Sequence, residues 1–339
     1  YVFSGSMLGT EFKGISSFPV GYVERIIMRP LDFEEYCWAV GVSAEVLAGI
    51  RDHMVNRVPV EDYVHEAMLR NFRSYLVAGG MPEVVQDYID SSYSLIRTRQ
   101  LQSELVDQYR TDIAKYAGKR AFAVRSIFDR LPLELEGENH RFILSSLKEG
   151  ARLDEYAEDF LWLTNAGVGL NVSRATEARS PLLRTESASF FKLYESDTGM
   201  LVSRYPQSTA RAIYLDQKSA NLGGVFENAV AQELAALGIP AWYYFTTAEG
   251  EVDFLVDGKG GRVVPIEVKS GVKVRSHAAL DNLLAKPGLK IPEAIVLSRE
   301  NVSQEGKVTY LPIYMTFCLD ELVEREADAG DFRFAPVAL

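Results

Sequence analysis

The sequence predicts an α/β protein with a mostly helical N-terminal part, a winged-helix-like middle part and a C-terminal part built on a mixed central sheet. Apolar residues recur three and four apart through the first half of the chain, and strand patterns of period two take over after Phe190. We therefore divide the chain into a β-rich opening segment (1–42), a helical segment (43–120), a winged-helix-like segment (121–184), a sheet domain (185–325) and a tail (326–339).

The helical segment contains two long amphipathic patterns, residues 60–80 and 92–117, which the break GGMPEVV separates. Gly79, Gly80 and Pro82 mark this break as a turn, because glycine and proline are the strongest local interruptions of a helix. We expect the turn to serve packing rather than chemistry.

Three short helical patterns follow, at 126–135, 140–149 and 153–167, and a strand-like stretch comes after them. This is the order of a winged helix, in which the third helix enters the major groove of DNA. Here the third pattern carries acidic residues and no Lys or Arg, so phosphates would repel it. We interpret the segment as a packing module for protein contacts, with DNA readout as the less favoured alternative.

The sheet domain begins with FFKLYESDTGML, which we expect to form a strand and a turn. A helix is expected from residue 223, where Phe226, Val230 and Leu234 follow helical spacing and Gly238 supplies a stop signal. The aromatic run AWYYF reads as a packed strand, with base stacking as the alternative. EAIVLS reads as a buried strand, and LPIYMTFCLDELVE as a strand with a closing helix.

Residues 250–271, GEVDFLVDGKGGRVVPIEVKSG, form the most informative stretch of the chain. VDFLVD alternates as a strand, DGKGG supplies a turn, and RVVPIEVKS is rich in β-branched residues, so we expect an antiparallel hairpin. Glu267 and Lys269 are two residues apart and therefore point to the same side of their strand. Asp253 lies on the neighbouring strand, so the three polar groups can converge.

Carboxylates and a lysine in this arrangement are typical of metal-dependent phosphodiester chemistry. Two carboxylates bind Mg²⁺ or Mn²⁺ through hard oxygen ligands, and a bound water becomes acidic enough to attack phosphorus. Lys269 would orient that water or neutralise developing charge. Glu227, at the edge of the apolar stripe of its helix, is a candidate third carboxylate, and Glu233 is a weaker one. The alternative for the hairpin is that it is solvated and that Glu267 and Lys269 form an exposed pair. The alternative for Glu227 is an ordinary glutamate in the first turn of its helix, where the helix dipole favours a negative charge.

The order Glu227, Asp253, Glu267-x-Lys269 resembles the PD-(D/E)XK nuclease superfamily, and GGVFENAVAQELAALGI resembles the first helix of archaeal Holliday-junction resolvases. The four blocks FFKLYESDTGML, GGVFENAVAQEL, GEVDFLVD and VPIEVKSG are more closely similar to a nuclease-like domain of unknown function that follows an AAA-type ATPase in many bacteria and archaea. The resemblance covers roughly residues 185–300 and implies a restriction-endonuclease-like α/β domain. It implies that Asp253 and Glu267 hold Mg²⁺ and that Glu227 binds a second ion or its water. Val252 stands where the motif has proline.

The opening segment resembles the end of the ATPase module of the same family, where a strand ending in Ser4 to Ser6 would occupy the sensor-one region before a PLDFEE segment. The chain begins without Met, and we interpret it as a fragment. Nothing in it matches G-x-x-x-x-G-K-[ST], so ATP would require an upstream P-loop that this chain lacks. We expect no ATPase activity from the chain alone, and structural roles for Arg25 and Arg29.

The charge balance restricts the partners. The net charge of −11 argues against broad, sequence-blind affinity for nucleic acid, so contact with DNA should be local, near Lys269, Lys273 and Arg275. No apolar run reaches the length of a membrane span, and two distant cysteines suggest neither a disulfide framework nor a zinc site, so a cytoplasmic location is expected. Two functions remain open: a Mg²⁺-dependent endonuclease, or a non-catalytic binding module attached to an ATPase or to further copies of the chain.

Overall fold

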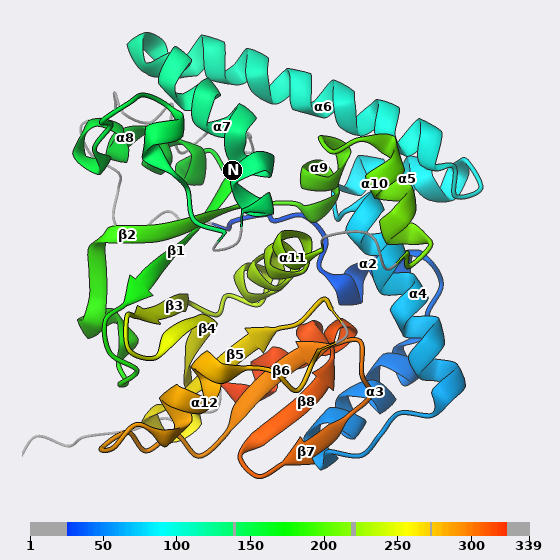
Figure 1. The fold of residues 1–339 in the computed structure, drawn as a ribbon. Coiled ribbons are helices and arrows are strands. Elements are labelled where there is room, and N and C mark those ends of the chain that lie inside the picture. The colour runs from blue at the N-terminus through cyan, green and yellow to red at the C-terminus, as the bar shows by residue number, and fades with distance from the viewer. Residues whose placement is uncertain (1–25, 138–139, 218–221, 272, 324–339) are drawn as a thin grey trace, which may run out of the picture.

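The computed structural model describes residues 26–137, 140–217, 222–271 and 273–323. Most of the predicted opening segment, including Ser4 to Ser6 and Arg25, lies outside the described residues, as does the predicted tail 326–339. The observed architecture is α/β: a helical N-terminal region is followed by a mixed sheet, as the sequence predicts (Figure 1). Within the described residues, no helix has the length and apolar character needed to cross a membrane.

Helices make up the N-terminal region because apolar positions repeat on one side of each segment. Asp32 begins the first described helix with a capping box, in which its carboxylate accepts from the Glu35 amide and the Glu35 carboxylate accepts in return from the Asp32 amide. The helices and 3₁₀ turns of this region are α2 (Phe33–Ala39), α3 (Ala44–Asn56), α4 (Asp62–Ala78), α5 (Pro82–Asp90), α6 (Leu95–Tyr116), η2 (Gly118–Arg120), α7 (Ala121–Glu136), η3 (Leu144–Ser146) and α8 (Leu153–Asn165).

The sheet has eight strands among the described residues, in the order β2-β1-β3-β4-β5-β6-β8-β7. The pairs β1–β3, β5–β6 and β6–β8 are parallel and the other pairs are antiparallel, so the predicted mixed sheet is confirmed. Its strands are β1 (Gly169–Ala175), β2 (Glu186–Glu195), β3 (Ala241–Thr246), β4 (Gly250–Gly258), β5 (Arg262–Val268), β6 (Ala294–Ser298), β7 (Ser303–Glu305) and β8 (Val308–Pro312).

The segment predicted to be winged-helix-like differs from that fold in two ways. The second predicted helix is only the short turn η3, because the Ile143 amide and the Ser146 hydroxyl donate to the Glu134 carboxylate, at 2.9 and 2.6 Å, and hold this stretch against α7. The strand β1 pairs with β2 but also runs parallel to β3, with Ser173 opposite Trp242. The strand pair is therefore the end of the large sheet, not a separate wing.

Helices of the C-terminal half cover both faces of the sheet. Side chains of one face pack beneath α12 (Ala278–Ala285), where Leu280 and Leu283 are fully buried. The other face packs against α11 (Gly223–Ala236) and the 3₁₀ helix η6 (Ile313–Leu322), which stands where a closing helix was predicted. α11 lies at the centre of the molecule, between the sheet and the helices of the N-terminal region (Figure 1), and every residue from Gly224 to Leu234 is buried.

The Gly79–Gly80 turn packs against the residues that follow β2. Asp197, expected in a turn, instead begins the short helix α9 (Thr198–Ser203), and a second short helix, α10 (Gln207–Tyr214), follows. The Asp197 carboxylate accepts from the Gly80 amide at 2.6 Å. A Cβ at Gly199 would lie 2.4 Å from the Gly79 nitrogen, so glycine permits this close approach. The turn joins the helical region to the sheet, which is the packing role that we expect from the sequence.

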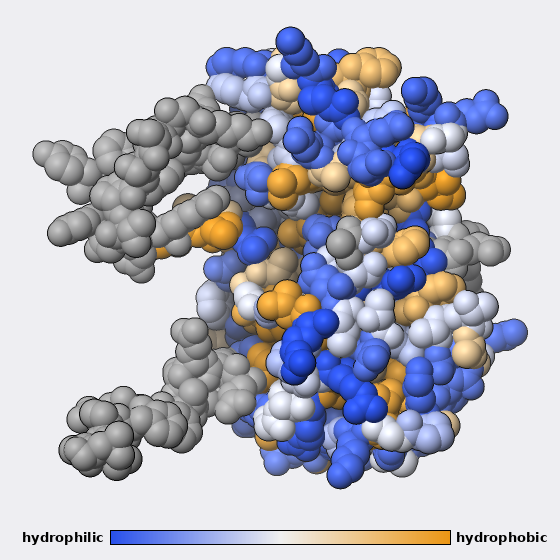
Figure 2. All heavy atoms as spheres, turned by 90° about the vertical axis from the view of Figure 1, so that its left-hand side faces the viewer, coloured by the Kyte–Doolittle hydropathy of each residue, from blue (hydrophilic) through white to orange (hydrophobic). Residues whose placement is uncertain are grey.

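The face that Figure 2 shows mixes hydrophilic residues with small apolar areas. This agrees with the ordinary composition of the chain, 47% hydrophobic and 24% charged.

Candidate functional site

The predicted hairpin is present and brings Asp253 and Glu267 together. β4 and β5 pair antiparallel with Phe254 opposite Ile266, and one further step of this register places Asp253 across from Glu267. The Asp253 carboxylate accepts from the Val268 amide at 2.7 Å, which holds it against β5. Lys269 follows the strand, and its amide donates to the Leu297 carbonyl of β6. Period two and the hairpin register thus place all three side chains at one end of two central strands.

Glu267 lies beneath Lys269, and one of its oxygens has no partner. The Lys269 Nζ donates to Glu267 Oε1 at 2.7 Å, so the pair exists but is not the solvated pair of the alternative interpretation, since Glu267 is only 5% exposed. Glu267 Oε2 is buried without a hydrogen-bond partner among the described residues. Burial raises the pKa of Glu267, although the charge of Lys269 acts in the opposite direction.

The electrostatics around Asp253 favour an added cation. Burial raises the pKa of Asp253 well above its ordinary value, and the negative charges of Glu227 and Glu267 raise it further. The pKa of Lys269 rises even though burial lowers it, because Glu267 and then Asp253 favour the ammonium form.

Glu227 comes near this group, but its carboxylate is occupied by other protein groups. Lys192 Nζ and the Tyr194 hydroxyl donate to Oε2 at 3.1 and 2.9 Å, and His140 Nδ1 donates to Oε1 at 2.6 Å. Burial alone would raise the pKa of Glu227, yet Lys192 and His140 outweigh it and lower the pKa to about 2. The predicted third carboxylate is thus fixed in the charged form by an internal cation.

Sequence reasoning missed Lys192 and the residues around it. Lys192 projects from β2, is fully buried, and also pairs with Glu251 of β4 at 2.7 Å. Arg141 bonds to the same Glu251 carboxylate and lies over the Phe245 ring, 4.1 Å from its centroid. One signal was available, because a lysine among the apolar residues of FFKLY needs an anion if that strand is buried on both faces.

Two other predicted contributors lie elsewhere. The Glu233 carboxylate accepts from the Phe33 amide and the Tyr75 hydroxyl, both at 2.9 Å, so it anchors α2 to α11 and does not enter the site. Arg275 stacks on Tyr310, with 3.7 Å from its guanidinium carbon to the ring centroid, and pairs with Glu300 and Glu305. Arg275 is therefore engaged within the protein and adds little to a cationic patch.

The donor set fits one hard cation better than a cluster. Within the described residues, no group of three or more His, Cys, Asp or Glu side chains is arranged to hold a metal ion. Asp253 and Glu267 lie opposite each other in the hairpin register, and the Oε2 of Glu267, which has no partner among the described residues, is an oxygen that a cation would satisfy. These two residues can hold Mg²⁺ or Mn²⁺ together with waters and a substrate oxygen.

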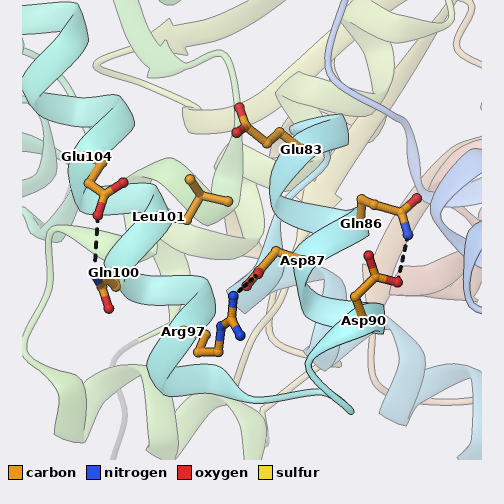
Figure 3. A pocket seen from close by; sticks show the side chains of 8 residues that line it. All are labelled: Glu83, Gln86, Asp87, Asp90, Arg97, Gln100, Leu101 and Glu104. Carbon is orange, nitrogen blue, oxygen red and sulfur yellow. Dashed lines mark hydrogen bonds and ion pairs between the residues drawn. The ribbon is translucent and has the colours of Figure 1, made fainter.

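A groove of about 640 Å³ lies between α5 and α6 (Figure 3), and neither Asp253 nor Glu267 lines it. Arg97 donates to Asp87 at 2.9 Å across it, so its one cation is already paired. Its lining is otherwise polar apart from one leucine and comprises Glu83, Gln86, Asp87, Asp90, Arg97, Gln100, Leu101 and Glu104. We assign it no chemistry.

Comparison with known families divides the chain into two matched parts. Residues 222–315 match a family model described as a domain of unknown function (DUF4143), and residues 69–210 match another described in the same words (DUF8612). No curated protein and no solved structure matches. The four predicted site residues lie in the DUF4143 part, whereas Lys192 and His140 lie in the DUF8612 part, so the site draws on both.

Proposed function

We propose that the chain is a metal-dependent phosphodiesterase of the PD-(D/E)XK nuclease type that acts on DNA in the cytoplasm, beside an AAA-type ATPase. The observation that carries the proposal is the convergence of Asp253, Glu267 and Lys269 at the end of the β4–β5 hairpin, with Glu267 Oε2 buried and unpaired. Burying charged groups in an otherwise apolar strand pair costs free energy unless a partner of opposite charge or a hydrogen-bonding group compensates them.

Each residue has a separate task. Asp253 and Glu267 would hold the cation, with Asp253 kept in place by the Val268 amide. The bound ion would supply an acidified water and a charge to polarise the phosphate. Lys269, at the rim with about a quarter of its side chain exposed, presents a positive charge where a phosphate oxygen becomes more negative. The overall charge of −11 makes DNA contact local and sensitive to salt.

The test is cleavage of supercoiled and branched DNA by the whole chain with Mg²⁺ or Mn²⁺. Glu267→Gln and Lys269→Ala are each expected to lower the rate by about a hundredfold or more, the usual effect of removing one group that stabilises the transition state. Glu104→Gln, an exposed carboxylate on α6, is the matched control and should leave the rate unchanged. Cleavage at the wild-type rate by both site variants would refute the proposal.

The second candidate is a non-catalytic binding module with a nuclease-like fold. The engagement of Glu227 and Arg275 within the protein favours it, because both were candidates for chemistry or DNA contact. It predicts that calorimetry detects no Mg²⁺ or Mn²⁺ binding and that DNA is not cut.

A further inference from the structure

Lys192 carries a buried positive charge beside the candidate site. Its side chain has no exposed surface, and its ammonium bonds to Glu227 at 3.1 Å and to Glu251 at 2.7 Å. The Tyr243 ring lies beneath it, 5.6 Å away. A buried ammonium is retained only when anions surround it, and two carboxylates from different elements, α11 and β4, meet that need.

The contacts of Glu227 leave little room for a metal ion. Both of its oxygens accept hydrogen bonds, one from His140 and the other from Lys192 and Tyr194. An ionised carboxylate has about four lone-pair positions, and three of those of Glu227 accept these bonds, so at most one is left for a metal ion. Glu267 differs from Glu227 in this respect, because its Oε2 is buried and accepts from no described group.

The formal charges separate into two groups. Lys192 and Arg141 carry two positive charges against the two negative charges of Glu227 and Glu251, so this group is neutral without any bound ion. Asp253 and Glu267 carry two negative charges when ionised, against the single positive charge of Lys269. With both carboxylates ionised, these three side chains carry a net charge of −1, which attracts a divalent cation and becomes +1 when one binds.

We propose that the site binds a single divalent cation through Asp253 and Glu267, and that Lys192 takes the place beside Glu227 that a second ion would fill. Glu227 is then a positioning residue, which holds Lys192 and His140, and it does not bind metal. This inference deepens the proposed function and rests on it, and it corrects the expectation that Glu227 is a ligand.

Calorimetric titration of the whole chain with Mn²⁺ tests the inference. We expect one ion per wild-type chain, no binding by Asp253→Asn, and binding by Glu227→Gln within about tenfold of wild type, since that change removes a nearby charge but no ligand. The two variants make the same carboxylate-to-amide change and control for each other. Two ions per wild-type chain, or a loss in Glu227→Gln as complete as in Asp253→Asn, would overturn the one-ion site while leaving the nuclease proposal standing. Absence of Mn²⁺ binding by the wild type would overturn both.

Thermal melting gives an independent readout for Lys192. Lys192→Met removes the cation that Glu227 and Glu251 share, so it should melt below the Lys192→Met, Glu227→Gln double variant, from which the buried carboxylate charge of Glu227 has also been removed. If Lys192→Met does not fold, the double variant carries the titration and should still bind one ion. A Lys192→Met protein that melts with the wild type would show that Lys192 is not the required cation.

Discussion

Gly80→Ala is expected to destabilise the junction between the helical region and the sheet. A Cβ at Gly80 would lie 2.0 Å from the Leu31 carbonyl oxygen, whereas non-bonded heavy atoms prefer about 3.5–4.0 Å. The three nearest atoms all belong to the Leu31 backbone, so no side chain can rotate away. The two segments must separate by roughly 1.5 Å to relieve the overlap.

Moving Gly80 away from Leu31 breaks the hydrogen bond between them and also displaces the Gly80 amide from its second partner, Asp197. The Leu31 amide donates to the Gly80 carbonyl at 2.7 Å, and the Gly80 amide donates to the buried Asp197 carboxylate at 2.6 Å. The neutral bond contributes about 1 kcal/mol and the charged one about 1.5–3 kcal/mol, so the loss should be about 3 kcal/mol. With an unfolding entropy of about 2.1 cal/mol/K per residue over 339 residues, that corresponds to a Tm lower by roughly 4 °C.

Differential scanning calorimetry near pH 7.5 would measure this loss. Burial raises the pKa of Asp197 to about 6, so its carboxylate is charged at that pH. Gly49→Ala is the matched control, because it lies within α3 and its added Cβ would meet nothing within 4 Å. The control should be stabilised by about 0.5–1 kcal/mol through helix propensity. A Gly80→Ala protein as stable as the control would refute the reasoning.

Three further outcomes are expected. Asp253→Asn should stabilise the metal-free protein by about 0.5–2 kcal/mol at pH 8. The pKa of Asp253 is raised in the folded state, so the stability of the wild type falls as the pH rises, and the difference between the two proteins should vanish below the ordinary carboxyl pKa of 3.8. Thermal melting across pH 3–8 checks this. Burial and the charge of Asp32 raise the pKa of Glu233, so the free energy of unfolding of Glu233→Gln should rise relative to that of the wild type as the pH rises above 4.5. If urea unfolding at several pH values gives the same pH dependence for both proteins, this expectation is wrong. Asn228→Leu should cost about 3 kcal/mol, because it leaves the buried Glu195 amide and carbonyl unpaired; denaturant midpoints within error of wild type would contradict this.

Local patterns were enough to predict the sheet hairpin and its polar end. Asp253, Glu267 and Lys269 lie on one hairpin, where the turn sets the register and period two sets the side, so no distant contact was needed to bring them together. The helical N-terminal region was predictable for the same reason, since helical spacing is visible within each segment.

Contacts between residues far apart in the sequence could not be predicted from local sequence patterns. The strand β1 was assigned to a wing because its parallel partner, β3, lies about seventy residues later and leaves no local signal. The apolar spacing around Leu144 predicts a helix where the structure has a 3₁₀ turn. The Glu134 carboxylate, which accepts from the Ile143 amide and the Ser146 hydroxyl, belongs to another helix.

The sequence by itself determined that two carboxylates and a lysine meet at the end of a hairpin, because covalent proximity and strand geometry suffice for that. Only the tertiary structure decided which groups surround Glu227. Its partners Lys192 and His140 are 35 and 87 residues away along the chain, and they reach it because β2 and the loop after α7 pack over α11. Burial then makes these contacts a fixed ion pair, because water cannot reach the buried charges and take the place of their protein partners.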